Sequence, residues 1–188
     1  MDKVKGSLVL EVARMIRANK EREWNKYLGD QDLELINSRV LASSWYPADV
    51  YERASYAIFM EIAKGSLEVA RAWGKFVVQD IINRYYPNLV QERDVGLALE
   101  KFRVIRSQWF QFDDPKVTPI EIMKLGPDKA KIVIRSDHPV PFEPYAHQAA
   151  GSFERVVELC GKTDVKATIT EHDWKADQPW AIIILAWK

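Results

Sequence analysis

Several features that define other protein classes are scarce in this sequence of 188 residues. Cys160 is the single cysteine, which excludes an internal disulfide and any multi-cysteine metal or iron–sulfur site and is typical of a reducing, cytoplasmic location. Lysine plus arginine number 27, and aspartate plus glutamate also number 27. Because no surplus of positive charge exists to attract phosphate backbones, we expect no nucleic-acid partner.

Long apolar runs are missing as well. The longest, Ala181–Trp187, has seven residues, whereas a membrane-spanning helix needs roughly 20. Near the start of the chain, Glu11 and Arg14 interrupt an apolar stretch too early for the core of a signal peptide. We therefore expect neither a membrane span nor export by that route.

What the sequence does contain is the composition of a folded domain. Hydrophobic residues make up 47% and charged residues 29%, with 8 glycines and 9 prolines. We expect one α+β domain over residues 1–188, with a helical N-terminal layer to about residue 113 and a ββαββ antiparallel sheet from about residue 114.

The first part of the chain has the periodicity of amphipathic helices. Apolar residues recur every three or four positions, and glycine, proline or serine separates the segments. The expected helices cover about residues 6–19, 24–28, 33–40, 47–64, 66–85 and 92–110.

Beyond residue 113 the periodicity changes. Residues 117–124 and 130–135 are rich in β-branched side chains and flank a turn, which predicts a hairpin. An apolar stripe over 142–161 predicts a helix whose small residues, Ala149 to Ser152, let it lie close to a sheet. Strands follow at 165–170 and 180–187. The last is apolar on both faces, so we expect it to be central or covered twice.

Three stretches carry a resemblance to a known family: Lys5–Leu10, Ala72–Phe76 continuing to Pro87, and Ile134–His138. Together with the helical part and the ββαββ order, they resemble the heme nitric-oxide/oxygen-binding (H-NOX) domain and its relatives. In the heme-binding family the third stretch looks like Tyr-x-Ser-x-Arg, which clamps the heme propionates. Here Ser136 matches, whereas Ile134 stands at the tyrosine position and His138 at the arginine position.

The resemblance also implies a histidine that binds the iron from the helix before the first hairpin. The matching segment, Leu97–Arg106, contains no histidine, since all three (His138, His147 and His172) follow residue 137. The chain therefore resembles the heme-less relatives of this family more closely. Its pattern is most similar to that of an uncharacterised myxobacterial paralogous family, and more distantly to that of the Golgi-tethering subunits. That likeness implies a ligand- or partner-binding module without a cofactor.

The resemblance also predicts which residues would form a binding site, because the relatives hold heme between their helices and their sheet. A remaining cavity would be lined by large apolar side chains, with a remnant of the propionate clamp at its edge. These candidate ligand-binding residues are Trp73, Phe76, Phe102, Ile105, Trp109, Ser136, His138 and Tyr145. The same aromatic residues also suit an ordinary helical core.

Catalytic and metal sites are not expected. Cys160 closes an apolar helical face, which favours packing over nucleophilic chemistry. His147 lies one position off its apolar stripe and is read as solvated, and His172 falls in a predicted loop. No metal-ligand spacing, nucleophile elbow, phosphate loop or dinucleotide fingerprint is present.

Two hypotheses about function follow, one for a binding module and one for a cofactor-dependent sensor. A third hypothesis, that the protein is an enzyme, has no acid–base motif to support it. The first is a cytoplasmic, heme-free sensory or adaptor module that binds a small apolar ligand or a protein partner and forms a homodimer. The alternative is a gas or redox sensor that binds heme or another tetrapyrrole through an unconventional ligand: His147, Tyr145 or Cys160.

Overall fold

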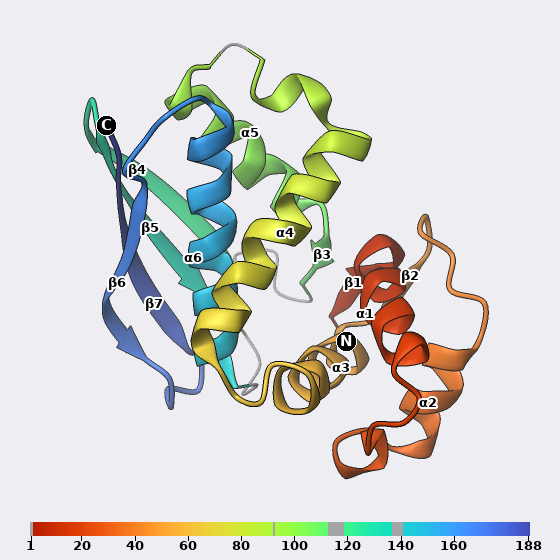
Figure 1. Ribbon diagram of the computed structural model, residues 1–188. Helices are drawn as coiled ribbons and strands as arrows, with labels where there is room; N and C mark the ends of the chain where they lie inside the picture. Colours follow the sequence, from red (N-terminus) through yellow and green to blue (C-terminus); the bar gives the residue numbers. More distant parts are fainter. Residues whose placement is uncertain (1, 92, 113–118, 137–140) are drawn as a thin grey trace. The chain divides into compact units, whose positions relative to one another are not determined.

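The computed structural model describes residues 2–91, 93–112, 119–136 and 141–188 (Figure 1). The chain divides into two compact units. The first consists of Met1–Ser66 with Ser107–Val117, and the second of Leu67–Arg106 with Thr118–Lys188. None of the helices in the described ranges is both long and apolar enough to cross a membrane.

The first unit combines helices with a small antiparallel sheet of order β2-β1-β3. Helix α1 forms where the sequence predicts it, because Leu8, Val12 and Ile16 repeat every four residues and all are buried. The described elements of this unit are α1 (Gly6–Ala18), the 3-10 helix η1 (Trp24–Lys26), α2 (Asp30–Asn37), α3 (Ala48–Glu61), β1 (Lys3–Lys5), β2 (Trp45–Pro47) and β3 (Phe110–Gln111).

The second unit packs helices on an antiparallel sheet of order β4-β5-β7-β6. Its described elements are α4 (Leu67–Tyr85), the 3-10 helix η2 (Pro87–Leu89), α5 (Val95–Ser107, within this unit up to Arg106), α6 (Phe142–Leu159), β4 (Ile120–Gly126), β5 (Lys129–Arg135), β6 (Lys166–Asp173) and β7 (Trp180–Ala186). The predicted ββαββ order is confirmed in this unit, as is the α+β class.

The compact units do not follow the expected division between a helical and a mixed layer near residue 113. The reason is that α4 and α5, expected in the helical layer, belong to the same unit as the sheet. The three short strands of the first unit were not predicted, since segments of two or three residues carry no readable alternation.

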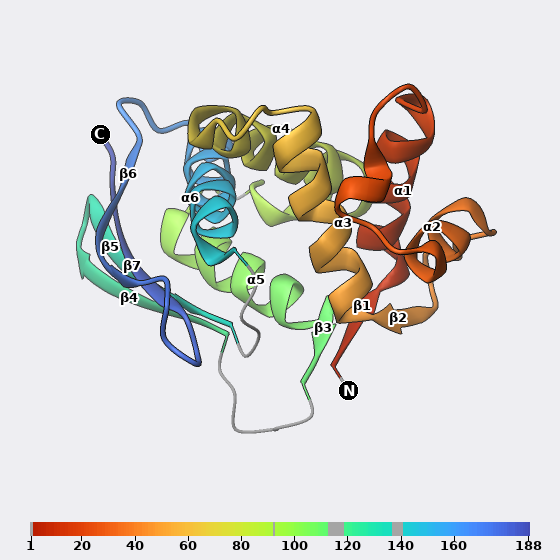
Figure 2. The same cartoon turned by 90° about the horizontal axis from the view of Figure 1, so that it is seen from below.

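One face of the large sheet is apolar and buried from solvent. Ile132, Ile134, Ile183 and Leu185 are fully buried and alternate along β5 and β7 with less buried residues. Helix α6 lies on this side of the sheet (Figure 2). The prediction that the last strand is central is confirmed, because β7 pairs with β5 on one side and β6 on the other.

Helices α4 and α6 approach each other closely. A Cβ atom on Gly74 would lie 1.9 Å from the carbonyl oxygen of Gln148, and one on Gly151 would lie 2.0 Å from that of Arg71. The Ser152 hydroxyl donates to the Gly74 carbonyl at 3.2 Å. Gly151 and Ser152, which we expected to bring α6 close to the sheet, therefore bring it close to α4.

We predict that Gly151→Ala lowers the free energy of unfolding by about 3 kcal/mol, since the added methyl group meets backbone on the facing helix. Urea denaturation measures the change. Gly126→Ala is the matched control, because its Cβ would have no contact nearer than 3.6 Å. Equal stability of the two variants would contradict the close approach.

Candidate functional site

The structure brings some of the predicted ligand-binding residues together and separates others. Phe76 is 62% exposed on α4, where its ring stacks on Trp73 at 5.4 Å. It therefore does not line an enclosed cavity. Trp109 belongs to the first unit, where its carbonyl accepts the Lys5 N–H at 2.8 Å. His138 lies outside the described residues.

Six of the described candidates lie in the second unit: Trp73, Phe76, Phe102, Ile105, Ser136 and Tyr145. Two of them, Phe102 and Tyr145, take part in an aromatic cluster between α5 and α6. The Phe102 ring meets the Phe153 ring edge-on at 5.5 Å, and both side chains are almost fully buried. Phe142 contacts Tyr145 at 5.4 Å. Ile105 is also buried on α5.

Arg106 is the residue that these rings surround. Its guanidinium carbon lies 5.6 Å from the ring centre of Tyr145, 5.8 Å from that of Phe102 and 5.9 Å from that of Phe153. One terminal nitrogen donates to the Tyr145 hydroxyl at 2.8 Å. Such contacts with ring faces stabilise a cation that has left water.

The environment of Arg106 is unusual for a buried cation. The residue is 7% exposed, and its Nε is buried without a hydrogen-bond partner. Among the described residues no carboxylate forms an ion pair with its guanidinium. Burying an unpaired charge is costly, which makes the Arg106 cluster (Phe102, Arg106, Tyr145, Phe153) a candidate functional site.

The sequence analysis did not select Arg106, although a signal was present. Arg106 lies four positions after Phe102 and seven after Leu99, so it continues the buried stripe of α5. A charged residue at a core position of an amphipathic helix indicates either a buried ion pair or a functional site.

The described residues do not fit heme held in the manner that the resemblance implies. Helix α5 carries no histidine to bind iron. Ile134, at the expected tyrosine position, is fully buried in β5 between Ile120 and Ala181 of the neighbouring strands. Of the expected clamp only Ser136 remains, and its backbone N–H donates to Pro179 at 3.0 Å.

Other potential heme ligands differ in their chemistry. Burial raises the pKa of the Cys160 thiol, which disfavours a thiolate, and the packing role expected for Cys160 is confirmed by its 2% exposure. His147 is partly buried on α6 rather than solvated as expected. Burial, aided by the charge of Arg71, lowers the pKa of its imidazole.

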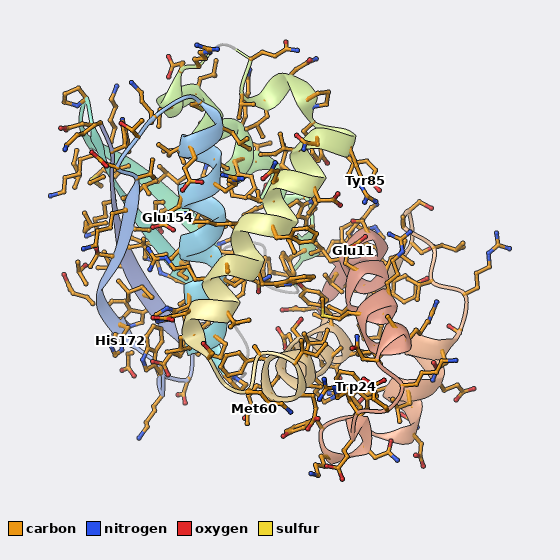
Figure 3. All side chains as sticks on the ribbon, in the orientation of Figure 1. Glu11, Trp24, Met60, Tyr85, Glu154 and His172 are labelled. Atoms are coloured by element: carbon orange, nitrogen blue, oxygen red, sulfur yellow. The ribbon has the colours of Figure 1, made fainter. Side chains whose placement is uncertain are left out.

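His172 is an exposed residue of β6 that stacks on Trp174 at 4.0 Å, and Figure 3 shows it at the surface of its unit. Its position at the surface fits the expectation, but the predicted loop is wrong at this residue, because β6 continues to Asp173. In the part of the chain that the structure describes, no group of three histidine, cysteine, aspartate or glutamate residues is placed to hold a metal ion.

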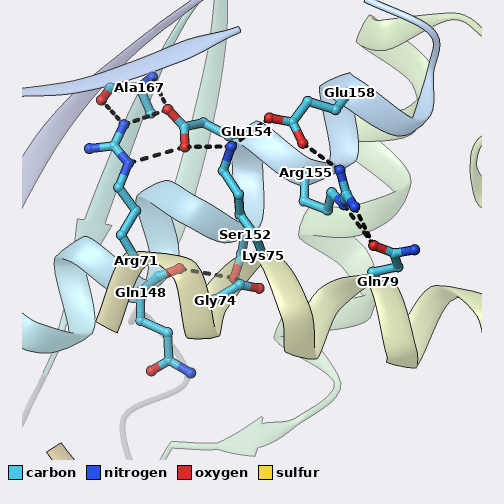
Figure 4. A network of polar contacts seen from close by, with 10 residues as sticks. All are labelled: Arg71, Gly74, Lys75, Gln79, Gln148, Ser152, Glu154, Arg155, Glu158 and Ala167. Carbon is cyan, nitrogen blue, oxygen red and sulfur yellow. Dashed lines mark hydrogen bonds and ion pairs between the residues drawn. The ribbon is translucent and has the colours of Figure 1, made fainter. Parts of the chain in front are cut away.

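A second polar cluster joins α4, α6 and β6 around Glu154, which is 4% exposed (Figure 4). Arg71 donates to both carboxylate oxygens and to the carbonyl of Ala167. The Ala167 N–H donates to Glu154 Oε1 at 2.8 Å, and the Lys75 ammonium lies 3.3 Å from Oε2. We call Glu154, Arg71, Lys75 and Ala167 the Glu154 clamp.

The clamp continues along the helix pair. Lys75 also pairs with Glu158 at 2.5 Å, and Arg155 contacts Glu158 at 2.7 Å and the Gln79 side chain at 2.9 Å. Both oxygens of Glu154 have partners, so the carboxylate is not available as an acid or base. The clamp therefore has a structural role.

Electrostatics keep Glu154 ionised. Burial alone would raise the pKa of its carboxyl group, but the hydrogen bonds from Arg71 and the Ala167 N–H and the charges of Arg71 and Lys75 outweigh that effect. The pKa consequently lies below its ordinary value.

An open pocket of about 790 Å³ lies elsewhere in the second unit, lined by residues of α5, β4, β5 and β7. Ion pairs stand within its wall, Glu100 with Arg103 on α5 and Glu121 with Arg135 at 2.6 Å across the hairpin. None of the predicted ligand-binding residues lines it. The lining residues are Glu100, Arg103, Ile120, Glu121, Ile122, Met123, Lys131, Val133, Arg135, Trp180 and Ile182.

No protein-family model matches the sequence, and no curated protein matches it. Solved structures do match across almost the whole chain. A structure from a study of heme distortion in the H-NOX family has a TM-score of 0.67 at 14% identity, covering 98% of this chain and 95% of that one.

Two further structures give the same picture. A variant of T. Tengcongensis H-NOX matches with a TM-score of 0.65 at 13% identity, covering 98% of this chain and 97% of that one. An oxygen-binding H-NOX domain related to soluble guanylate cyclases matches at 0.61 and 12% identity, covering 96% and 92%. The chain therefore has the H-NOX fold, as the resemblance implied, while its closer likeness to heme-less relatives stays a prediction.

We predict that acid weakens the protein through Glu154. Because the folded-state pKa lies below the unfolded value, the stabilisation is complete at neutral pH and is lost as pH falls through the folded pKa. Glu154→Gln should lower the free energy of unfolding by about 3 kcal/mol at neutral pH. It should also flatten the decline of stability below about pH 4.5.

Denaturation at a series of pH values tests this dependence. Glu158→Gln is the matched control, since Glu158 is on the same helix but its side chain is 24% exposed, and it should cost about 1 kcal/mol. An acid profile of Glu154→Gln identical to that of the unmodified protein would refute the role of this carboxylate.

We predict that Tyr145 stabilises the fold mainly through Arg106. Tyr145→Phe removes the hydroxyl that accepts a hydrogen bond from Arg106, and should cost about 1–3 kcal/mol. Arg106→Met should be neutral or stabilising, because an apolar side chain replaces an unpaired buried cation. In the Arg106→Met background, Tyr145→Phe should cost less than about 0.5 kcal/mol. Equal costs in both backgrounds, measured by urea denaturation, would disprove this coupling.

Proposed function

We propose that this protein is a heme-free binding module with the H-NOX fold, acting as a cytoplasmic sensor or adaptor without catalytic activity. The observation that carries the proposal is helix α5, which has no imidazole to bind iron although the fold matches H-NOX structures over 98% of the chain. The burial of Ile134 at the position expected for a propionate-binding tyrosine supports it further.

The Arg106 cluster indicates the chemistry of a small ligand. Aromatic rings favour an apolar body, and a guanidinium with an unpartnered Nε favours an acidic group. A ligand that carries both features would supply the negative charge that the described neighbours of Arg106 lack. A protein partner that inserts an acidic side chain has the same chemistry.

The proposal of a non-catalytic module is supported by the state of the titratable groups. The Glu154 oxygens are occupied by the clamp, and Cys160 is buried with a raised pKa. A general base must be able to reach a substrate proton, which a fully bonded buried carboxylate cannot do.

One observation favours a second candidate, a sensor that binds heme or another tetrapyrrole through an unconventional ligand. The lowered pKa of His147 leaves its imidazole neutral near pH 7, which is the form that binds iron. Tyr145 is a weaker candidate, since its hydroxyl already accepts from Arg106.

An absorbance spectrum of protein expressed with added heme precursor distinguishes the two functions. We expect no Soret band, and native mass spectrometry of the same sample should show either the bare chain or a co-purified mass that is lost in Arg106→Met. A Soret band that disappears in His147→Ala but persists in the control His172→Ala would overturn the heme-free proposal.

A further inference from the structure

Among the described elements of the second unit, no helix lies over the face of the large sheet opposite α6 (Figure 2), although Glu100 and Arg103 of α5 border the pocket that this face contributes to. Residues that pair directly across antiparallel strands point to the same face, so the register defines this outer sheet face. Met123, Lys131, Ile184 and Thr168 form one row, and Glu121, Val133, Ile182 and Glu171 form the next. Arg135, Trp180 and Asp173 form the third.

The middle of the outer sheet face is apolar. On β7 it presents Trp180, Ile182 and Ile184, which are all partly exposed, and Val133 lies beside Ile182 on β5. Met123 on β4 is 61% exposed. Strands that face only water alternate apolar with polar residues, so an apolar row on a central strand indicates that another surface covers it.

Charges on the two sides of the apolar row have opposite signs. Lys131 and Arg135 lie on β5, where Arg135 also pairs with Glu121 of β4 at 2.6 Å, and Glu171 and Asp173 lie on β6, with β7 between them. A two-fold axis parallel to β7 would stack two copies face to face, with β7 against β7 and the β5 of each copy opposite the β6 of the other. Each basic side would then meet an acidic side.

We propose that the outer sheet face is the interface of a homodimer with this two-fold arrangement. The self-complementary charge pattern selects a second copy of this chain over an unrelated partner. In the dimer Arg135 of one copy faces Asp173 of the other, and Lys131 and Arg135 flank Glu171.

At the opposite end of the face, Lys129 and Lys166 lie in one row on either side of β7. In the dimer, Lys129 of one copy would face Lys166 of the other, which places like charges together. Two stacked sheets cross at about 30°, which separates them at the ends, and lysine side chains are long enough to turn into water. The like charges therefore place the tight part of the interface at the Trp180 end.

The size of the face determines the strength of the dimer. Four strands of about seven residues cover roughly 450 Å². A stable complex buries about 800 Å² per partner, so this interface belongs to the weak, reversible class. The dimer should form in the micromolar range, and it depends on neither heme nor the Arg106 cluster.

Sedimentation velocity across the micromolar range tests the interface. The unmodified protein should pass from monomer to dimer, and Ile182→Lys should raise the dissociation constant at least tenfold while leaving the circular dichroism spectrum unchanged. Leu41→Lys is the matched control, because Leu41 is 46% exposed but belongs to the first unit, and it should dimerise normally.

Charge exchange tests the two-fold arrangement. Lys131→Glu and Glu171→Lys should each weaken self-association about tenfold, because each places like charges opposite one another in both copies. Mixing the two variants should restore a heterodimer, and the double variant should restore the homodimer. A monomer at every concentration, or a dimer that Ile182→Lys leaves intact, would overturn the proposal, as would a failure of the mixture to associate.

Discussion

The close packing of α4 on α6 is the contact on which the second unit depends. Gly74 and Gly151 let the two backbones meet where any Cβ atom would collide with a carbonyl group. The Glu154 clamp then ties both helices to β6 through Arg71 and Ala167. Because α6 also covers the buried face of the sheet, this single helix joins the helical and β parts of the unit.

The position of α6 determines what surrounds α5. Tyr145 and Phe153 project from α6 to Phe102 and Arg106, so the place where the resemblance implies an iron-binding helix holds a cation among aromatic rings. At the positions that the resemblance assigns to heme binding, Ile134 and the α5 residues Phe102 and Arg106 are buried among protein side chains. The buried Arg106 cation and the apolar outer sheet face are the two features proposed to bind other molecules.

Much of the fold was predictable from the sequence, because helices such as α1, α4 and α6 and the β4–β5 hairpin have long, regular apolar patterns. Such patterns show which residues are buried but not which element buries them. For this reason Gly151 was expected against the sheet and lies against α4. The resemblance already placed Phe102 and Tyr145 in one expected site. The position of Arg106 between them was missed, because it depends on contacts between residues about 40 positions apart, which periodicity does not report.

The central claim is that this H-NOX fold is complete without heme. Any molecule that binds only the folded state raises the free energy of unfolding, by an amount that grows with the logarithm of its free concentration above the dissociation constant. The direct measurement is therefore urea denaturation of protein produced without heme precursor, with and without equimolar hemin. We expect the same midpoint in both conditions, whereas a midpoint that rises with hemin and returns to its original value in His147→Ala would contradict the claim.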